Sequence, residues 1–189
     1  MNSLKSQKGY NLKDKRLLVT VRSVVTTFFM LCMSLLLAAY ANTSEDHINK
    51  GINHLEDMNY RGALIDFNSE IMLNPDNAPA FNYRGVTKAK LGDFDGAIMD
   101  YNRSINLEPN SIEALNNRGI AKARTGDLDG SISDFDIAIS IDPLNGNSYF
   151  NHGMAMDMIS NITSACSDWE KSYNLGFKEA NRFVKQKCS

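Results

Sequence analysis

Hydrophobic and polar residues follow two different patterns along the 189-residue chain. Residues 24–40 form one apolar run, VVTTFFMLCMSLLLAAY, with no amphipathic helical spacing. After residue 44, pairs of segments carry apolar residues at helical spacing and are separated by short polar turns. Such segments predict amphipathic helices. We therefore expect a body of helix pairs that follows an unrelated N-terminal segment.

The helix pairs repeat with a period of 34 residues. Four sets of equivalent positions in successive repeats, here called columns, carry related residues. Glycine recurs at Gly51, Gly85, Gly119 and Gly153, and proline at Pro75, Pro109 and Pro143. Small residues recur at Ala63, Ala97, Ser131 and Ala165, and aromatic residues at Phe67, Tyr101, Phe135 and Trp169. A fixed period of this length is typical of solenoids built from stacked units.

The second copy shows how one unit is built. Its apolar segments, residues 80–91 and 95–107, are separated by Gly92-Asp93, where glycine relieves the end of one helix and Asp93 or Asp95 caps the next. Pro109 ends the second segment, because proline cannot continue a helix. Gly85 lies inside the first segment, where glycine is unfavourable by about 1 kcal/mol relative to alanine. This predicts close packing against a small residue of the second helix, Ala97.

The copies at residues 80–110 and 114–144 resemble the tetratricopeptide repeat in their Gly, Leu-Gly-Asp-Phe, Ala, aromatic and Pro positions. The resemblance covers about residues 44–177. It implies an all-α, right-handed solenoid of about four 34-residue helix-turn-helix repeats, followed by a capping helix at 178–189. The expected repeats are 44–77, 78–111, 112–145 and 146–177. Stacking supplies the core, since no single repeat buries its apolar face.

The resemblance also implies a concave groove, lined by the first helices, that receives peptides or helices of another protein. On this chain the candidate groove residues are Asn82, Val86, Lys90, Asn116, Ile120, Arg124, Phe150 and Met154, with Ala89, Ala123 and Asp157 between them. Asn82 and Asn116 are expected to hydrogen-bond a ligand backbone, and Lys90 with Arg124 to receive acidic groups. The clamp of the chaperone-tail-binding branch is incomplete, because Ile48 and Phe150 fill two of its places, so that function is not carried over.

Two further columns are charged. A cation precedes each packing glycine at Lys50, Arg84, Arg118 and His152, and a carboxylate precedes each aromatic residue at Asp66, Asp100, Asp134 and Asp168. Arginine–carboxylate pairs can be bidentate, so these columns predict a ladder of ion pairs that fixes the register of the repeats. A charged groove for a ligand is the alternative.

The remaining composition points away from catalysis. No glycine-rich phosphate loop, no G-x-S-x-G and no H-E-x-x-H motif occurs, so we expect no catalytic residue and no cofactor. His47 and His54 could share a helix face, but no third ligand stands at metal spacing, and no metal site is expected. The net charge of −2, with no basic cluster beyond the N-terminus, excludes a nucleic-acid partner. Secreted helical-repeat enzymes that bind β-lactams fit less well, because their repeats are longer and rich in cysteine.

The N-terminus has the organisation of an export signal. Lys13, Lys15 and Arg16 precede the apolar run, which ends in Ala39-Tyr40-Ala41. We expect residues 1–41 to be a signal peptide, the mature chain to begin at Asn42, and the protein to be periplasmic or secreted. In the alternative, an uncleaved anchor through 24–40 makes the chain a membrane-tethered structural or assembly subunit of an envelope complex. Without that anchor, no membrane contact is expected.

Cysteine positions agree with export. Removing residues 1–41 removes Cys32 and leaves Cys166 and Cys188, an even number that suits an oxidising compartment. The pair is predicted to form a disulfide that joins the capping helix to the second helix of the last repeat. Two free buried thiols are the alternative. The sequence as a whole predicts a non-catalytic protein–protein interaction scaffold.

Overall fold

The computed structural model describes residues 25–35 and 47–188 and divides the chain into two units, Met1–Glu45 and Asp46–Ser189. In the first unit, residues 25–35 are helical and mostly exposed. Within the described ranges, no helix combines the length and the apolar character needed to cross a membrane. The predicted cleavage site at Ala41 and the mature start at Asn42 lie outside the described residues.

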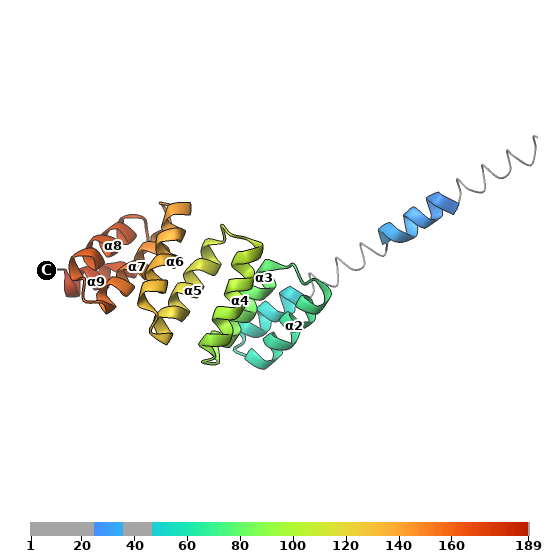
Figure 1. The fold of residues 1–189 in the computed structure, drawn as a ribbon, viewed down its shortest axis with the longest axis horizontal. Helices are drawn as coiled ribbons and strands as arrows, with labels where there is room; N and C mark the ends of the chain where they lie inside the picture. Colours follow the sequence, from blue (N-terminus) through green and yellow to red (C-terminus); the bar gives the residue numbers. More distant parts are fainter. Residues whose placement is uncertain (1–24, 36–46, 189) are drawn as a thin grey trace, which may run out of the picture. The chain divides into compact units, whose positions relative to one another are not determined.

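The second unit is an all-α stack of helix pairs, which confirms the predicted fold class (Figure 1). After a helix at residues 47–56, the elements are α2 (Tyr60–Leu73), α3 (Ala78–Lys90), α4 (Phe94–Leu107), α5 (Ile112–Thr125), α6 (Leu128–Ile141), α7 (Gly146–Met158), α8 (Ile162–Asn174) and α9 (Ala180–Lys187). Each helix packs mainly against its neighbours in the chain, as expected of a solenoid.

Side-chain caps set the helix boundaries. The Asp93 carboxylate accepts a hydrogen bond from the Gly96 backbone N–H at 2.9 Å, so Asp93 rather than Asp95 begins α4. Helix α3 begins at Ala78, two residues before the apolar pattern predicts, because the Asn77 side chain accepts from the Ala80 N–H at 3.1 Å. Such caps satisfy N–H groups that have no partner inside the helix.

The turn inside each repeat needs one residue in the left-handed backbone conformation, with a positive φ angle. Gly92 and Gly126 supply it in the two central repeats, with φ angles of 86° and 91°. Met58 and Ser160 occupy the same position in the first and fourth repeats, with φ angles of 58° and 62°. A side chain in this conformation costs roughly 1–2 kcal/mol. The outer repeats therefore keep the turn geometry although their turn sequences diverge.

The packing glycines lie against the aromatic column. A Cβ atom on Gly85 would lie 2.6 Å from Cε1 of Tyr101, and one on Gly119 would lie 2.6 Å from Cε1 of Phe135. The predicted close approach of the two helices is present, but its nearest partner is the aromatic ring rather than the small residue Ala97. Ala97 is itself fully buried, so it belongs to the same close-packed interface.

Helix α9 closes the end of the stack. Its Ala180 is buried with Ala165 and Trp169 of α8, and Phe183 packs on the Trp169 ring at a centroid distance of 5.1 Å. Cys166 of α8 and Cys188 are joined by a disulfide with a Cα–Cα distance of 5.5 Å. The capping helix is therefore held both by apolar packing and by a covalent bond.

Candidate functional site

The charged columns form bidentate ion pairs between the two helices of a repeat. Arg84 on α3 donates from Nε and Nη2 to the two carboxylate oxygens of Asp100 on α4, at 2.9 and 2.6 Å. Arg118 repeats this geometry with Asp134 at the same two distances. The Asp134 side chain is only 2% exposed, so the pair is well shielded from water.

Each arginine also reaches the preceding repeat. Nη1 of Arg84 donates to the side-chain Oδ1 of Asn68 on α2, and Nη1 of Arg118 donates to Oδ1 of Asn102 on α4, both at 2.8 Å. One guanidinium thus joins three helices and fixes the angle between repeats. Because its donors are used in this way, the geometry favours the structural interpretation of the ladder over a ligand-binding one.

A histidine contacts the ladder carboxylate at both ends of the ladder. Nδ1 of His152 lies 2.7 Å from the carboxylate of Asp168, and its Nε2 lies 3.4 Å from that of Asp136 on α6. In the first repeat, Nδ1 of His54 lies 2.8 Å from one carboxylate oxygen of Asp66, and Nδ1 of His47 lies 3.9 Å from the other. Neither histidine stands in the predicted column of cations. Among the described residues, no group of three or more His, Cys, Asp or Glu side chains is arranged to hold a metal ion.

The stability of the fourth repeat is expected to fall as the pH rises. Hydrogen bonding to Asp168 and the charges of Asp168 and Asp136 raise the pKa of His152 above its usual value, although burial opposes the shift. A raised pKa gives stability that is complete below the unfolded-state pKa and is lost as the pH rises through the folded-state value. Urea unfolding between pH 5.5 and 8.5 measures this loss, and His152→Arg, which restores the residue of the central repeats, is expected to reduce it. An unchanged pH dependence in that variant would contradict this assignment.

Asn82 and Asn116, which were predicted to hydrogen-bond a ligand backbone, form side-chain hydrogen bonds between neighbouring repeats. Asn82 is 4% exposed; it donates to Glu113 at 3.0 Å and accepts from Asn117 at 3.0 Å, both on α5. Asn116 is 7% exposed and donates to the Ser148 hydroxyl of α7 at 2.8 Å. Both amides therefore join adjacent first helices, because the 34-residue period stacks them against the next repeat, and Asn116 also lines a hollow described below.

Five of the predicted groove residues come together around one hollow of about 420 Å³ between α5 and α7. We call it the α5–α7 hollow; it is lined by Ile120, Ala123, Arg124, Phe135, Phe150, Asn151, Met154, Ala155 and Met158. Val86 instead packs on the core beside Tyr101, and Lys90, although exposed, borders none of the hollows described here. Asp157 forms an ion pair with Lys187 of α9. The groove is therefore open in the C-terminal half of the stack.

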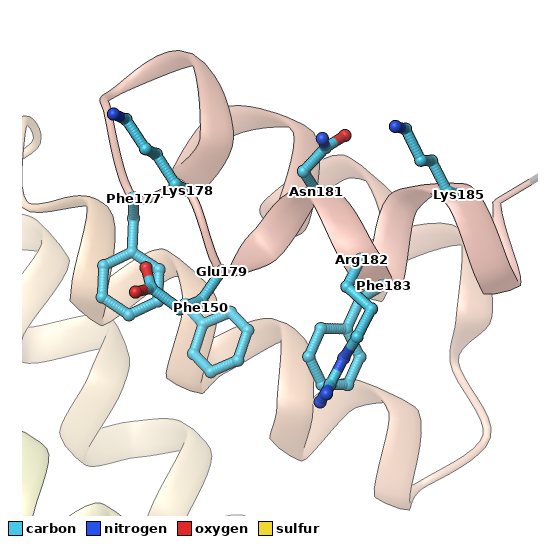
Figure 2. A pocket seen from close by; sticks show the side chains of 8 residues that line it. All are labelled: Phe150, Phe177, Lys178, Glu179, Asn181, Arg182, Phe183 and Lys185. Carbon is cyan, nitrogen blue, oxygen red and sulfur yellow. The ribbon is translucent and has the colours of Figure 1, made fainter.

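A second hollow, of about 730 Å³, lies between α7 and the capping helix. We call it the cap hollow; it is lined by Phe150, Phe177, Lys178, Glu179, Asn181, Arg182, Phe183 and Lys185 (Figure 2). The phenyl rings of Phe177 and Phe183 lie 5.0 and 5.3 Å from that of Phe150, measured between centroids. Phe150 lines both hollows, so they adjoin at its ring.

Sequence reasoning missed the cap hollow because it treated α9 only as a cap. The sequence does carry a signal for it, because three basic residues, Lys178, Arg182 and Lys185, are spaced by four and three residues, the spacing of one helix face. Figure 2 shows the side chains of Lys178 and Lys185 pointing away from the phenyl rings, so that an apolar floor has a cationic rim.

A further hollow of about 380 Å³ adjoins the α5–α7 hollow at Ile120 and Asn151. Amide side chains dominate its lining, which comprises Ile112, Glu113, Asn116, Asn117, Ile120, Asn145, Asn147 and Asn151. Amides can pair with the backbone groups of an extended segment. The three hollows together extend from α5 to α9 along the first helices.

Known structures share this architecture. A TPR repeat family model matches residues 87–126, from the end of α3 through α5. The matched residues resemble a TPR repeat, and the fold as a whole is a TPR-like helical solenoid. MamA from Desulfovibrio magneticus RS-1 is 15% identical, with a TM-score of 0.66 over 75% of this chain and 81% of that one. PilF of Pseudomonas aeruginosa is 17% identical, with a TM-score of 0.68 over 73% of this chain and 63% of that one.

The first TPR of Spaghetti (RPAP3), solved with the HSP90 peptide SRMEEVD bound, is 18% identical, with a TM-score of 0.61 over 63% of this chain and 94% of that one. Identities this low establish the fold and not a shared ligand. A search of curated proteins finds no match to this chain.

Proposed function

We propose that this protein is a non-catalytic scaffold that binds a peptide or helical segment of another protein in the groove formed by its first helices and α9. The observation that carries the proposal is the convergence of Ile120, Arg124, Phe150 and Met154 on one apolar hollow. Apolar hollows with a few polar groups at the edge are typical of binding sites.

The exposure of the lining residues supports this role. Ile120 is 42% exposed and Met158 is 54% exposed, although both lie beside buried residues of the same hollow. Covering such side chains stabilises a complex by about 25 cal/mol for each Å² of apolar surface removed from water. Methionine adapts to partners of different shape, which suits a surface that receives a side chain from another protein.

The Spaghetti (RPAP3) structure offers an analogy, because a TPR of the same fold is bound there to the HSP90 peptide SRMEEVD. That ligand is not transferred to this chain, since Asn82 and Asn116 are engaged between repeats and Phe150 occupies one position of the corresponding clamp. The proposal rests on the groove of this chain alone.

A matched pair of substitutions tests the binding surface. Ile120→Asp in the groove is expected to reduce co-precipitation of partner proteins at least tenfold, because a carboxylate would have to be desolvated inside the hollow. Ile137→Asp on α6 is the control, since Ile137 is also 42% exposed but borders none of the described hollows. Quantitative mass spectrometry of the bound fractions gives the ratio. Equal loss in both variants, or loss only in Ile137→Asp, would contradict the proposed surface.

We also propose that the protein is exported and that its mature chain begins at Asn42. The disulfide between Cys166 and Cys188 supports an oxidising compartment. The intact mass of the protein from the exported fraction is expected to correspond to residues 42–189. A mass equal to the full 21.1 kDa would instead favour the uncleaved membrane anchor.

A further inference from the structure

We propose that the groove selects an acidic segment that carries two apolar anchor residues, one for the α5–α7 hollow and one for the cap hollow. This inference rests on the proposed function and adds the chemistry of the partner. Two features of the groove support it, namely the cations that border it and the two apolar hollows that meet at Phe150.

The cations of the groove differ from those of the ion-pair ladder. In the ladder, Arg84 and Arg118 are neutralised by buried carboxylates. In the groove, by contrast, three cations form no ion pair with any part of the chain that the structure describes, namely Arg124, Lys178 and Lys185. Cζ of Arg182 lies 4.9 Å from the centroid of the Phe183 ring. Glu179 is the acidic residue in the lining of these two hollows.

These cations stand out against the charge of the whole chain. Residues 1–41 hold six of the 20 basic residues and one of the 22 acidic ones, so the rest of the chain has an excess of acidic groups. A cationic groove on an acidic body attracts a partner whose carboxylates meet Arg124 at one hollow and Arg182 or Lys185 at the other. The same excess of acid disfavours a polyanion as long as a nucleic acid, which would extend beyond the groove.

The two hollows supply the apolar part of the recognition. The α5–α7 hollow presents Ile120, Met154 and Met158, which suit an aliphatic side chain. The cap hollow presents three phenyl rings with centroid distances of 5.0 and 5.3 Å, which suit an aromatic or large aliphatic side chain. Since Phe150 lines both hollows, one continuous segment can supply both anchors.

A phage-displayed library of random 12-residue peptides is the probe for this inference, with the folded chain of residues 42–189 as the bait. Wild-type protein is expected to select peptides of net negative charge that contain at least two residues from Leu, Ile, Met, Phe, Trp and Tyr. By fluorescence anisotropy, replacing the acidic residues of a selected peptide with lysine is expected to weaken binding at least tenfold, and so is replacing its two apolar residues with alanine.

A charge reversal in the protein provides the matched test. Arg124→Glu with Arg182→Glu is expected to lower affinity for a selected acidic peptide at least tenfold and to shift library selection toward basic peptides. Arg61→Glu with Lys171→Glu changes the net charge equally on the second helices of other repeats, and is expected to leave the affinity within about twofold. Both proteins must melt within a few degrees of wild type, since exposed charges contribute about 0.5 kcal/mol or less.

Four results would overturn the inference. They are selection of no peptide, selection without an acidic bias, equal loss of affinity in the two double variants, and binding of a 12-nucleotide oligothymidylate as tight as that of the selected peptide. None of these results removes the proposed function if Ile120→Asp still loses cellular partners while Ile137→Asp retains them.

Discussion

Gly119→Leu is expected to abolish cooperative folding of the third repeat. A Cβ atom at this position would lie 2.6 Å from Cε1 of Phe135, and the remaining leucine atoms would enter the same space. The Phe135 ring is 2% exposed, so moving it aside would disturb the side chains packed around it. Overpacking of this kind costs about 1–3 kcal/mol and sometimes more, and a whole isobutyl group places this variant at or beyond the upper end.

Because each repeat is stabilised mainly by its neighbours, the damage is expected to spread to the second and fourth repeats. Circular dichroism during urea unfolding measures the loss. Ser133→Leu is the control, since it places the same side chain at an exposed position of α6, and its midpoint should remain close to that of wild type. A normal transition in Gly119→Leu would mean that the glycine column does not set the helix spacing.

Loss of the disulfide is expected to free the capping helix. The bond between Cys166 and Cys188 closes a loop with a sequence separation of 22 residues. For a loop of this length the chain-entropy model gives a stabilisation of about 3 kcal/mol. Helix α9 has eight residues, too few to remain helical alone, so Cys166→Ser with Cys188→Ser should expose it and remove one wall of the cap hollow.

Hydrogen exchange at residues 180–187 and the free energy of unfolding measure this effect. Dithiothreitol should lower the stability of the wild-type protein toward that of the double serine variant and leave the variant unchanged. Equal exchange rates in oxidised wild type and the serine variant would show that apolar packing of Phe183 on Trp169 is sufficient to hold α9.

The sequence predicted the fold because each level of its pattern points to the same repeat. Gly92, Asp93 and Pro109 mark the turn, the cap and the end of a helix, and the aromatic column occupies the space that the packing glycines leave open. The ion-pair ladder was also predictable, since Arg118 and Asp134 share the 34-residue period.

The site was predictable only in part, because position within a repeat does not determine what the next repeat covers. Asn116 and Ile120 lie one turn apart on α5, yet Asn116 is buried against α7 whereas Ile120 is 42% exposed. Arg182 and Phe183 line the cap hollow only because of the way α9 docks against α7 and α8, and the repeat pattern does not specify this docking.

Site-specific photocrosslinking tests the central claim, that partners are bound in the groove, most directly. A benzophenone side chain would replace Met158, which lines the α5–α7 hollow and is 54% exposed, or Ile65 on α2, which is 67% exposed and lies away from that hollow. After irradiation of living cells, we expect covalent adducts with the same partner from Met158, and none from Ile65. Adducts from Ile65 with none from Met158 would contradict the assignment of the groove as the binding surface.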